Sequence, residues 1–272
     1  MGAGRRVHHG LAALLAVSAL AVLCGCGGGA DRGADEVGAY VDRAIAEMRD
    51  GIHADTDAFR AAVAGAEPEL RAQSSIVRTY PCLRSLAVAA GSEHSSFLSP
   101  VEVQAVEAVD QPGATFAIPT TSTYGGVTVL TLPAFNGQSD EAVDRYRRSG
   151  LDALQAAAAD TTCGWIVDLR TNGGGNAWAM LAVVAPLLDD GRVVGLRSKD
   201  ETQWAEIADG GVVSTPGGPG TGTSGGFTLD GPVAILTSTM TASAAEIVAL
   251  AFVGQDDPVR VGSPTAGFTT GN

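Results

Sequence analysis

Short apolar runs alternate with helical patterns over the second half of the chain, and this alternation constrains the fold more than any other feature. The runs expected to be strands cover residues 126–132, 165–169, 192–196, 232–237 and 258–261. Helical patterns cover residues 140–159, 176–188 and 244–252. Strands that alternate with helices predict an α/β layered core with mainly parallel pairing. The glycine-rich stretch 208–226 is expected to be a mobile surface loop.

The first residues have the form of an export signal. Arg5 and Arg6 precede an apolar stretch from Leu11 to Leu23, which is too short to span a bilayer but fits a signal peptide. The stretch ends in Cys24-Gly25-Cys26, which resembles a bacterial lipobox with Cys26 as the lipidated residue; an ordinary cleaved secretion signal is the alternative. We therefore expect a lipoprotein signal peptide at 1–26 and a flexible tether at 27–34. A lipid alone would anchor the exported protein to the outer face of the cytoplasmic membrane.

Charge and cysteine content narrow the class of partner. The formal net charge is −13, and loss of the leader would remove two arginines but no acid. So acidic a chain has no electrostatic basis for binding nucleic acid. Cys82 and Cys163 would remain after processing. In an exported protein an even pair predicts a disulfide, with two buried free thiols as the alternative. Their spacing does not resemble a metal site, and no cofactor is expected.

The mature chain divides into two predicted parts. Apolar residues recur at helical spacing between 35 and 92, so these residues are expected to form a helical N-terminal region. The core would then span 93–272. Near its start, Ser99-Pro100-Val101-Glu102 has the form of a capping box with proline at the first helical position.

Ser243 stands between a predicted buried strand and a predicted helix. A hydroxyl at such a turn projects into the crevice at the carboxyl end of a sheet, where the first N–H groups of the helix can bind an oxyanion. Acyl-transfer chemistry places its nucleophile there; a plain N-cap is the alternative. The glycines at 173–175 form either a tight turn or a place where the backbone approaches a substrate. His94, among small polar residues, is either a base or a structural histidine.

Together these segments resemble the C-terminal-processing, or tail-specific, serine peptidases. Asp168 to Gly175 match the family pattern Asp-Leu-Arg-x-Asn-x-Gly-Gly. Residues 243–246, Ser-Ala-Ala-Glu, match a nucleophile segment close to Ser-Ala-Ser-Glu, and residues 262–267 match Gly-x-Pro-Thr-x-Gly. The resemblance implies a crotonase-like core and an acyl-enzyme on Ser243. It also implies an oxyanion hole from the backbone N–H of Ala244 and that of Gly174 or Gly175. The PDZ domain of many members is missing, because only about 25 residues separate the histidine segment from the first core strand.

The expected base departs from the commonest family pattern. Many members pair the serine with a lysine directly after the last motif, where this chain has Phe268, and its single lysine, Lys199, lies in a polar linker. One branch of the family uses a histidine in an Asp-x-His-Ser-type segment, which His94 and Ser95 resemble. The acid that orients the histidine in such relatives follows the nucleophile by more residues than remain here. Three possibilities stay open: a core truncated at its C-terminus, a dyad without a third residue, or an inactive protein.

We therefore expect a serine-type endopeptidase that acts on a peptide or protein substrate, with Ser243 as nucleophile and His94 as base. A catalytically inactive, lipid-anchored binding protein on the same core is the alternative. A crotonase-type acyl-CoA enzyme is disfavoured, because acyl-CoA is cytosolic and this chain is expected to be exported.

Overall fold

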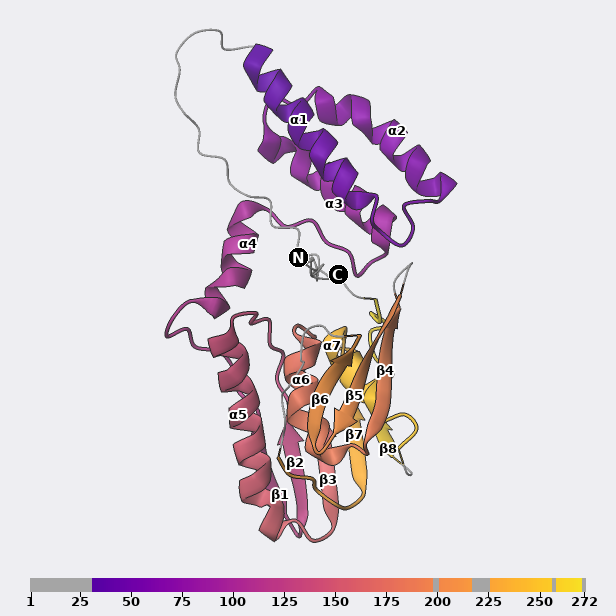
Figure 1. Ribbon diagram of the computed structural model, residues 1–272. Coiled ribbons are helices and arrows are strands. Elements are labelled where there is room, and N and C mark those ends of the chain that lie inside the picture. The colour runs from indigo at the N-terminus through magenta and orange to yellow at the C-terminus, as the bar shows by residue number, and fades with distance from the viewer. Residues whose placement is uncertain (1–30, 198–200, 217–225, 256–257, 271–272) are drawn as a thin grey trace, which may run out of the picture. The chain divides into compact units, whose positions relative to one another are not determined.

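The computed structural model describes residues 31–197, 201–216, 226–255 and 258–270, and the chain forms two compact units that divide near residue 106 (Figure 1). The predicted signal peptide with Cys26 and the linker residue Lys199 lie outside these residues. Among the helices that are described, none is both long enough and apolar enough to cross a membrane.

The N-terminal unit is helical, as the apolar spacing predicts. Its main helices are α1 (Asp31–Met48), α2 (Asp57–Arg71) and α3 (Tyr80–Gly91), and the short 3-10 helix η1 (Ile76–Thr79) precedes α3. Val41, Leu70 and Leu83 lie at the centre of their shared core. The predicted tether at 27–34 is wrong in its last four residues, because α1 already begins at Asp31. No proline lies between the start of this helix and its first buried residue, Val37, so the helix can begin several residues before Val37.

The predicted capping box is present at the start of α4 (Pro100–Glu107). The Glu102 carboxylate accepts hydrogen bonds from the Ser99 backbone N–H at 2.7 Å and from its hydroxyl at 2.6 Å. The Glu102 N–H donates back to the Ser99 hydroxyl at 3.4 Å. Arg84 donates to the same carboxylate at 2.7 Å. The Arg84 guanidinium, followed by the Ser99 hydrogen bonds, lowers the pKa of Glu102 to about 2.

The C-terminal unit contains a five-stranded sheet in the order β1-β2-β3-β7-β8. Its strands are β1 (Thr120–Tyr124), β2 (Val127–Thr131), β3 (Gly164–Asp168), β7 (Val233–Thr237) and β8 (Val259–Gly262). All neighbours are parallel except β1 and β2. β1 was not predicted from the sequence. Gly125 and Gly126, with φ angles of 57° and 82°, close a two-residue hairpin between β1 and β2.

A second sheet is antiparallel throughout and is a correction to the predicted parallel pattern. It consists of β4 (Gly191–Arg197), β5 (Thr202–Ala208) and β6 (Gly211–Thr215). The surface loop expected at 208–226 is therefore wrong over 211–215, while 217–225 lies outside the described residues. The physical reason is burial, because Val212 joins the core beside Ala205 and Ile207.

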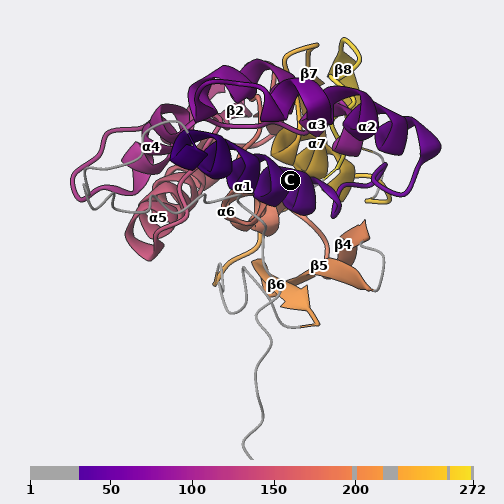
Figure 2. The ribbon, with the colours of Figure 1, turned by 90° about the horizontal axis from the view of Figure 1, so that it is seen from above.

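Helices α5 (Asp140–Ala157), α6 (Ala177–Val184) and α7 (Ala244–Ala251) complete the C-terminal unit. In the register of the large sheet, Leu130, Val167 and Ile235 belong to one buried face. Helices α6 and α7 lie between this sheet and the small sheet (Figure 2). Residues 179–184 of α6 are buried on all sides, as a helix between two layers must be. The predicted class, a layered α/β core with parallel strands and a small helical N-terminal region, is confirmed.

Candidate active site

Ser243 occupies the strand-to-helix turn expected from the sequence. It is the N-cap residue of α7, and its backbone adopts φ 54° and ψ −121°. A residue with a side chain rarely adopts a positive φ, and the strain is of the order of 1–3 kcal/mol. Neighbouring hydrogen bonds hold this conformation: the Ala242 N–H donates to the Asn172 carbonyl at 3.1 Å, and the Glu246 N–H donates to the Ser243 carbonyl at 2.8 Å. The turn is therefore fixed on both sides of the serine.

The carboxylate of Glu246 ties this turn to the third family motif. Its side chain is 3% exposed. Oε2 accepts from the backbone N–H groups of Ser243 at 2.8 Å and Phe268 at 2.7 Å. Oε1 accepts from the Thr265 hydroxyl at 2.6 Å and the Gly267 N–H at 2.8 Å. From the sequence, Glu246 is only the last residue of the 243–246 motif. The Ser-x-x-Glu spacing of a capping box was the signal for its larger role.

The glycine-rich turn after β3 lies against the serine. A Cβ added at Gly174 would fall 2.7 Å from Ser243 Cβ and 3.2 Å from the Ala244 nitrogen. Gly174 also has a φ of 107°, so the position favours glycine on two grounds. The Gly174 N–H, however, donates to the Asn172 side-chain oxygen at 2.9 Å. This bond corrects the expectation that Gly174 could serve as oxyanion donor, because its N–H is already used. Of the two predicted glycines, Gly175 is then the candidate donor.

Asn172 and Asp168 shape the same turn. Asn172 is fully buried, and its side-chain nitrogen donates to the Leu132 carbonyl at 2.9 Å. Asp168 forms a two-point ion pair with Arg170, with bonds of 2.9 and 2.7 Å. The Arg170 guanidinium lowers the pKa of Asp168, against an opposing effect of burial. The turn therefore has a charged, solvent-facing side and a buried, amide-bonded side.

His94 lies in the N-terminal unit, in a turn that follows α3. The Ser95 N–H donates to the Ser92 carbonyl at 3.0 Å, and Ser92 adopts a φ of 84°. A Cβ added at Gly91 would fall 1.9 Å from the Ser95 hydroxyl, so only glycine lets the turn fold back onto the helix end. His94 itself is half-buried. Its pairing with Ser243, which belongs to the C-terminal unit, stays a prediction.

Cys82 and Cys163 are both free thiols, so the structure does not contain the predicted disulfide. Cys82 lies in α3, where burial raises the pKa of its thiol. Cys163 belongs to the other unit, and its sulfur lies 3.7 Å from the Gly125 carbonyl oxygen. Each cysteine is thus placed by the packing of its own unit. The alternative of two buried thiols fails for Cys163, which is exposed.

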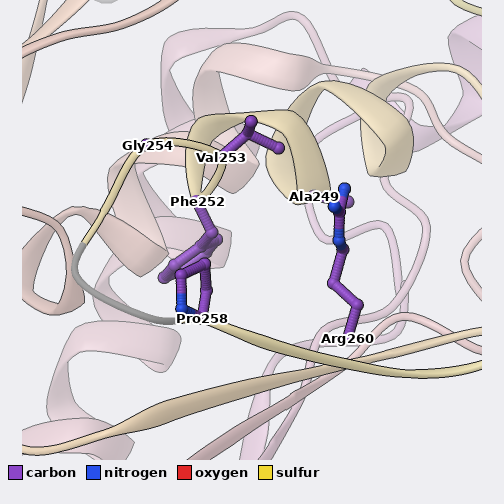
Figure 3. A pocket seen from close by; sticks show the side chains of 6 residues that line it. All are labelled: Ala249, Phe252, Val253, Gly254, Pro258 and Arg260. Carbon is purple, nitrogen blue, oxygen red and sulfur yellow. The ribbon is translucent and has the colours of Figure 1, made fainter.

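A surface hollow lies at the far end of α7. It is lined by Ala249, Phe252, Val253, Gly254, Pro258 and Arg260 (Figure 3). Since an eight-residue helix is about 12 Å long and the hollow begins at Ala249 in its last turn, most of α7 separates the hollow from Ser243. Over the described ranges, no group of three or more His, Cys, Asp or Glu side chains is placed to hold a metal ion.

The serine at the start of α7 and the glycine-rich turn against it belong to a segment with a clear family match. Residues 126–272 match the model of peptidase family S41, and the chain belongs to that family. This finding confirms the resemblance to C-terminal-processing peptidases and supports a peptidase function.

One relative matches most of this chain. The chain is 30% identical to the nisin-resistance protein of Lactococcus lactis subsp. lactis over 199 residues, which are 71% of this chain and 58% of that protein. This chain therefore spans less than two thirds of that relative.

Two solved structures show the same fold. A lipoprotein from Streptococcus agalactiae superposes with a TM-score of 0.70 at 20% identity, covering 86% of this chain and 78% of that one. A putative peptidase from Parabacteroides merdae superposes with a TM-score of 0.52 at 13% identity, covering 89% and 78%.

Proposed function

We propose that this protein is a serine peptidase that cleaves peptide bonds through an acyl-enzyme on Ser243. The observation that carries the proposal is the strained, doubly fixed backbone of Ser243 at the start of α7. His94 removes the hydroxyl proton as the serine oxygen attacks a peptide carbonyl, and then returns the proton to the leaving amine. Water hydrolyses the acyl-enzyme and regenerates the serine.

The oxyanion of the tetrahedral intermediate would bind two backbone N–H groups, those of Ala244 and Gly175. Ala244 is the first residue of α7, so its N–H has no acceptor within the helix. Gly175 is the exposed neighbour of Gly174, whose own N–H is occupied. Each such donor is worth about 3 kcal/mol of transition-state stabilisation.

We assign the role of base to His94 by comparing the positions at which the family carries a base. Phe268 stands where many family members carry a lysine, and its N–H shares the Glu246 oxygen that holds Ser243. The position is thus close to the nucleophile but offers no base. His94 is the histidine that matches a family segment, whereas His53 lies outside any motif.

A fluorophosphonate probe tests the nucleophile. The wild-type protein should be labelled and Ser243→Ala should not, with both proteins folded as judged by circular dichroism. Equal labelling of the two would exclude Ser243 as nucleophile, and no labelling of a folded wild type would favour the inactive binding protein.

The base is tested with two histidine variants of the same unit. We expect His94→Ala to lower the labelling rate about 10²-fold or more, because a positioned base contributes that much. His53→Ala is the matched control and should label like the wild type. A reversed result would show that His94 has been given the wrong role.

We also propose that Cys26 carries a lipid anchor at the outer face of the cytoplasmic membrane. The lipobox-like sequence supports this, and the structural relative from Streptococcus agalactiae is called a lipoprotein. Cys26→Ala should shift the protein from the membrane fraction to a soluble or unprocessed pool. Unchanged membrane association with normal processing would contradict the anchor.

The substrate is proposed to be a peptide or protein. Because one relative is called a nisin-resistance protein, nisin is the first substrate to test. Mass spectrometry should reveal cleavage of nisin by the wild type and none by Ser243→Ala. If labelled, active protein leaves nisin intact, the substrate is another peptide.

A further inference from the structure

Met240 is an exposed apolar residue three positions before the nucleophile. It is 62% exposed, although it stands only three residues after the end of β7. The other large apolar side chains that are exposed in the described part of the C-terminal unit are Ile118, Tyr124, Leu250, Val253, Val259 and Val261. Of this set, Met240 is the one in the loop that leads from a strand into Ser243.

The turn that carries Met240 is rigid. The Met240 N–H donates to the Ser238 hydroxyl at 3.0 Å, and the Thr241 N–H donates to the Ser238 carbonyl at 3.0 Å. The Thr241 hydroxyl is buried and donates to the Leu169 carbonyl at 2.8 Å. The exposure of Met240 is therefore a fixed feature of the turn, since the backbone on both sides is bonded to the protein.

The reach of the chain keeps Met240 near the bond that Ser243 would attack. Three residues span at most about 11 Å, even when fully extended. An extended peptide advances about 3.3 Å per residue. The side chain of Met240 can therefore meet only a substrate residue within about three positions of the bond that Ser243 attacks. In open α/β sheets, ligands bind at this carboxyl edge of the strands.

Resting on the proposed function, we infer that Met240 is a specificity-determining residue that contacts a bulky apolar or aromatic side chain of the substrate near the scissile bond. Methionine is apolar and flexible, and its sulfur makes favourable contacts with aromatic rings, so it accepts apolar side chains of several shapes. A polar substrate residue at the same place would lose its water without gaining a partner.

The test uses quenched fluorescent peptides in which a leucine or a serine occupies, in turn, each of the three positions on either side of the cleaved bond. The wild type should prefer leucine at one of these positions. Met240→Ser should reduce that preference in kcat/KM about 10-fold, as expected for the loss of one apolar contact. Met240→Leu should keep the preference. Tyr124→Ser is the matched control, because Tyr124 is 72% exposed at the β1–β2 turn, far from the carboxyl ends of β3 and β7.

The preference is a ratio within one enzyme preparation, so it does not depend on the fraction of active protein. If fluorophosphonate fails to label Ser243 in the wild type, the proposed function falls and this inference falls with it. If labelling is normal but Met240→Ser keeps the wild-type leucine preference at every position, the inference about Met240 alone is overturned.

Discussion

Replacing Glu246 by alanine should damage stability and activity together. The carboxylate accepts four hydrogen bonds, and one of them fixes the backbone of the nucleophile itself. The variant removes every acceptor at once. It also leaves a cavity in α7, where Glu246 is 3% exposed.

The magnitude follows from where each donor lies. Thr265 and Phe268 are half-buried and Gly267 is exposed, so water can replace much of what they lose, at a net cost of about 1 kcal/mol each. Ser243 is also half-buried, but its N–H bond is the one that fixes the strained turn, so we assign it the full value of a hydrogen bond to a charged group, about 1.5–3 kcal/mol. The sum for Glu246→Ala is about 4.5–6 kcal/mol, a large fraction of the stability of a typical domain.

The Glu246→Gln variant separates the effect of the carboxylate charge from the effect of the side-chain shape. The amide NH₂ cannot accept the two N–H donors at the Oε2 position, those of Ser243 and Phe268. At the Oε1 position it meets one N–H and the Thr265 hydroxyl, which can rotate to accept. The amide should therefore orient with its oxygen toward Ser243 and lose mainly the bond to Gly267, at about 1–3 kcal/mol.

Two measurements decide the outcome. In denaturant unfolding, the wild type should be the most stable, Glu246→Gln less stable and Glu246→Ala the least stable. Fluorophosphonate labelling of the folded fraction should fall about 10²-fold in the alanine variant, the usual effect of a nucleophile misplaced by about 1 Å. Glu141→Ala, an exposed acid in the first turn of α5, is the control and should change little. Wild-type stability and labelling in Glu246→Ala would refute the reasoning.

Two further predictions test neighbouring features. Gly174→Ala should unfold at a lower temperature by calorimetry, because its Cβ would collide with Ser243 at a φ of 107°, whereas Gly173→Ala, with no atom within 4 Å of its Cβ, should keep the wild-type melting temperature. The Glu102 carboxylate has a folded pKa of about 2 against an ordinary value of 4.5, so its stabilisation is complete above pH 4.5 and is lost as the pH falls toward 2. The difference in melting temperature between the wild type and Glu102→Gln should therefore shrink over that interval, and a constant difference would show that the charge is not responsible.

The central strands of the large sheet could be predicted because their composition alone is typical of buried strands. Residues 164–168 and 233–237 are short apolar runs, and strands buried in a parallel sheet have that composition. β1 has mostly Thr and Ser and is largely exposed, so hydrophobicity gave no sign of it, and only the Gly-Gly turn pointed to a hairpin. β6 was hidden by the glycines around it. Its two valines and serine become a strand because β5 supplies the hydrogen-bonding partner, which is a tertiary effect.

The residues of the site could be predicted from the sequence, but the hydrogen bonds that connect them could not. Ser243 and the turn at 172–175 are marked by local sequence, since each follows an apolar strand and precedes a helix. The Ala242 N–H joins the two turns by donating to the Asn172 backbone carbonyl, and the Glu246 carboxylate joins the serine turn to residues 265–268. The Asn172 side chain fixes the glycine-rich turn from within. A backbone N–H has no sequence signature, because every residue except proline has one. The interaction of the three motifs, which are separate in the chain, can therefore be seen only in the folded structure, where the sheet brings their turns to one edge. There the Asn172 backbone carbonyl and the buried Glu246 carboxylate hold the nucleophile in place, mainly by accepting hydrogen bonds from backbone N–H groups.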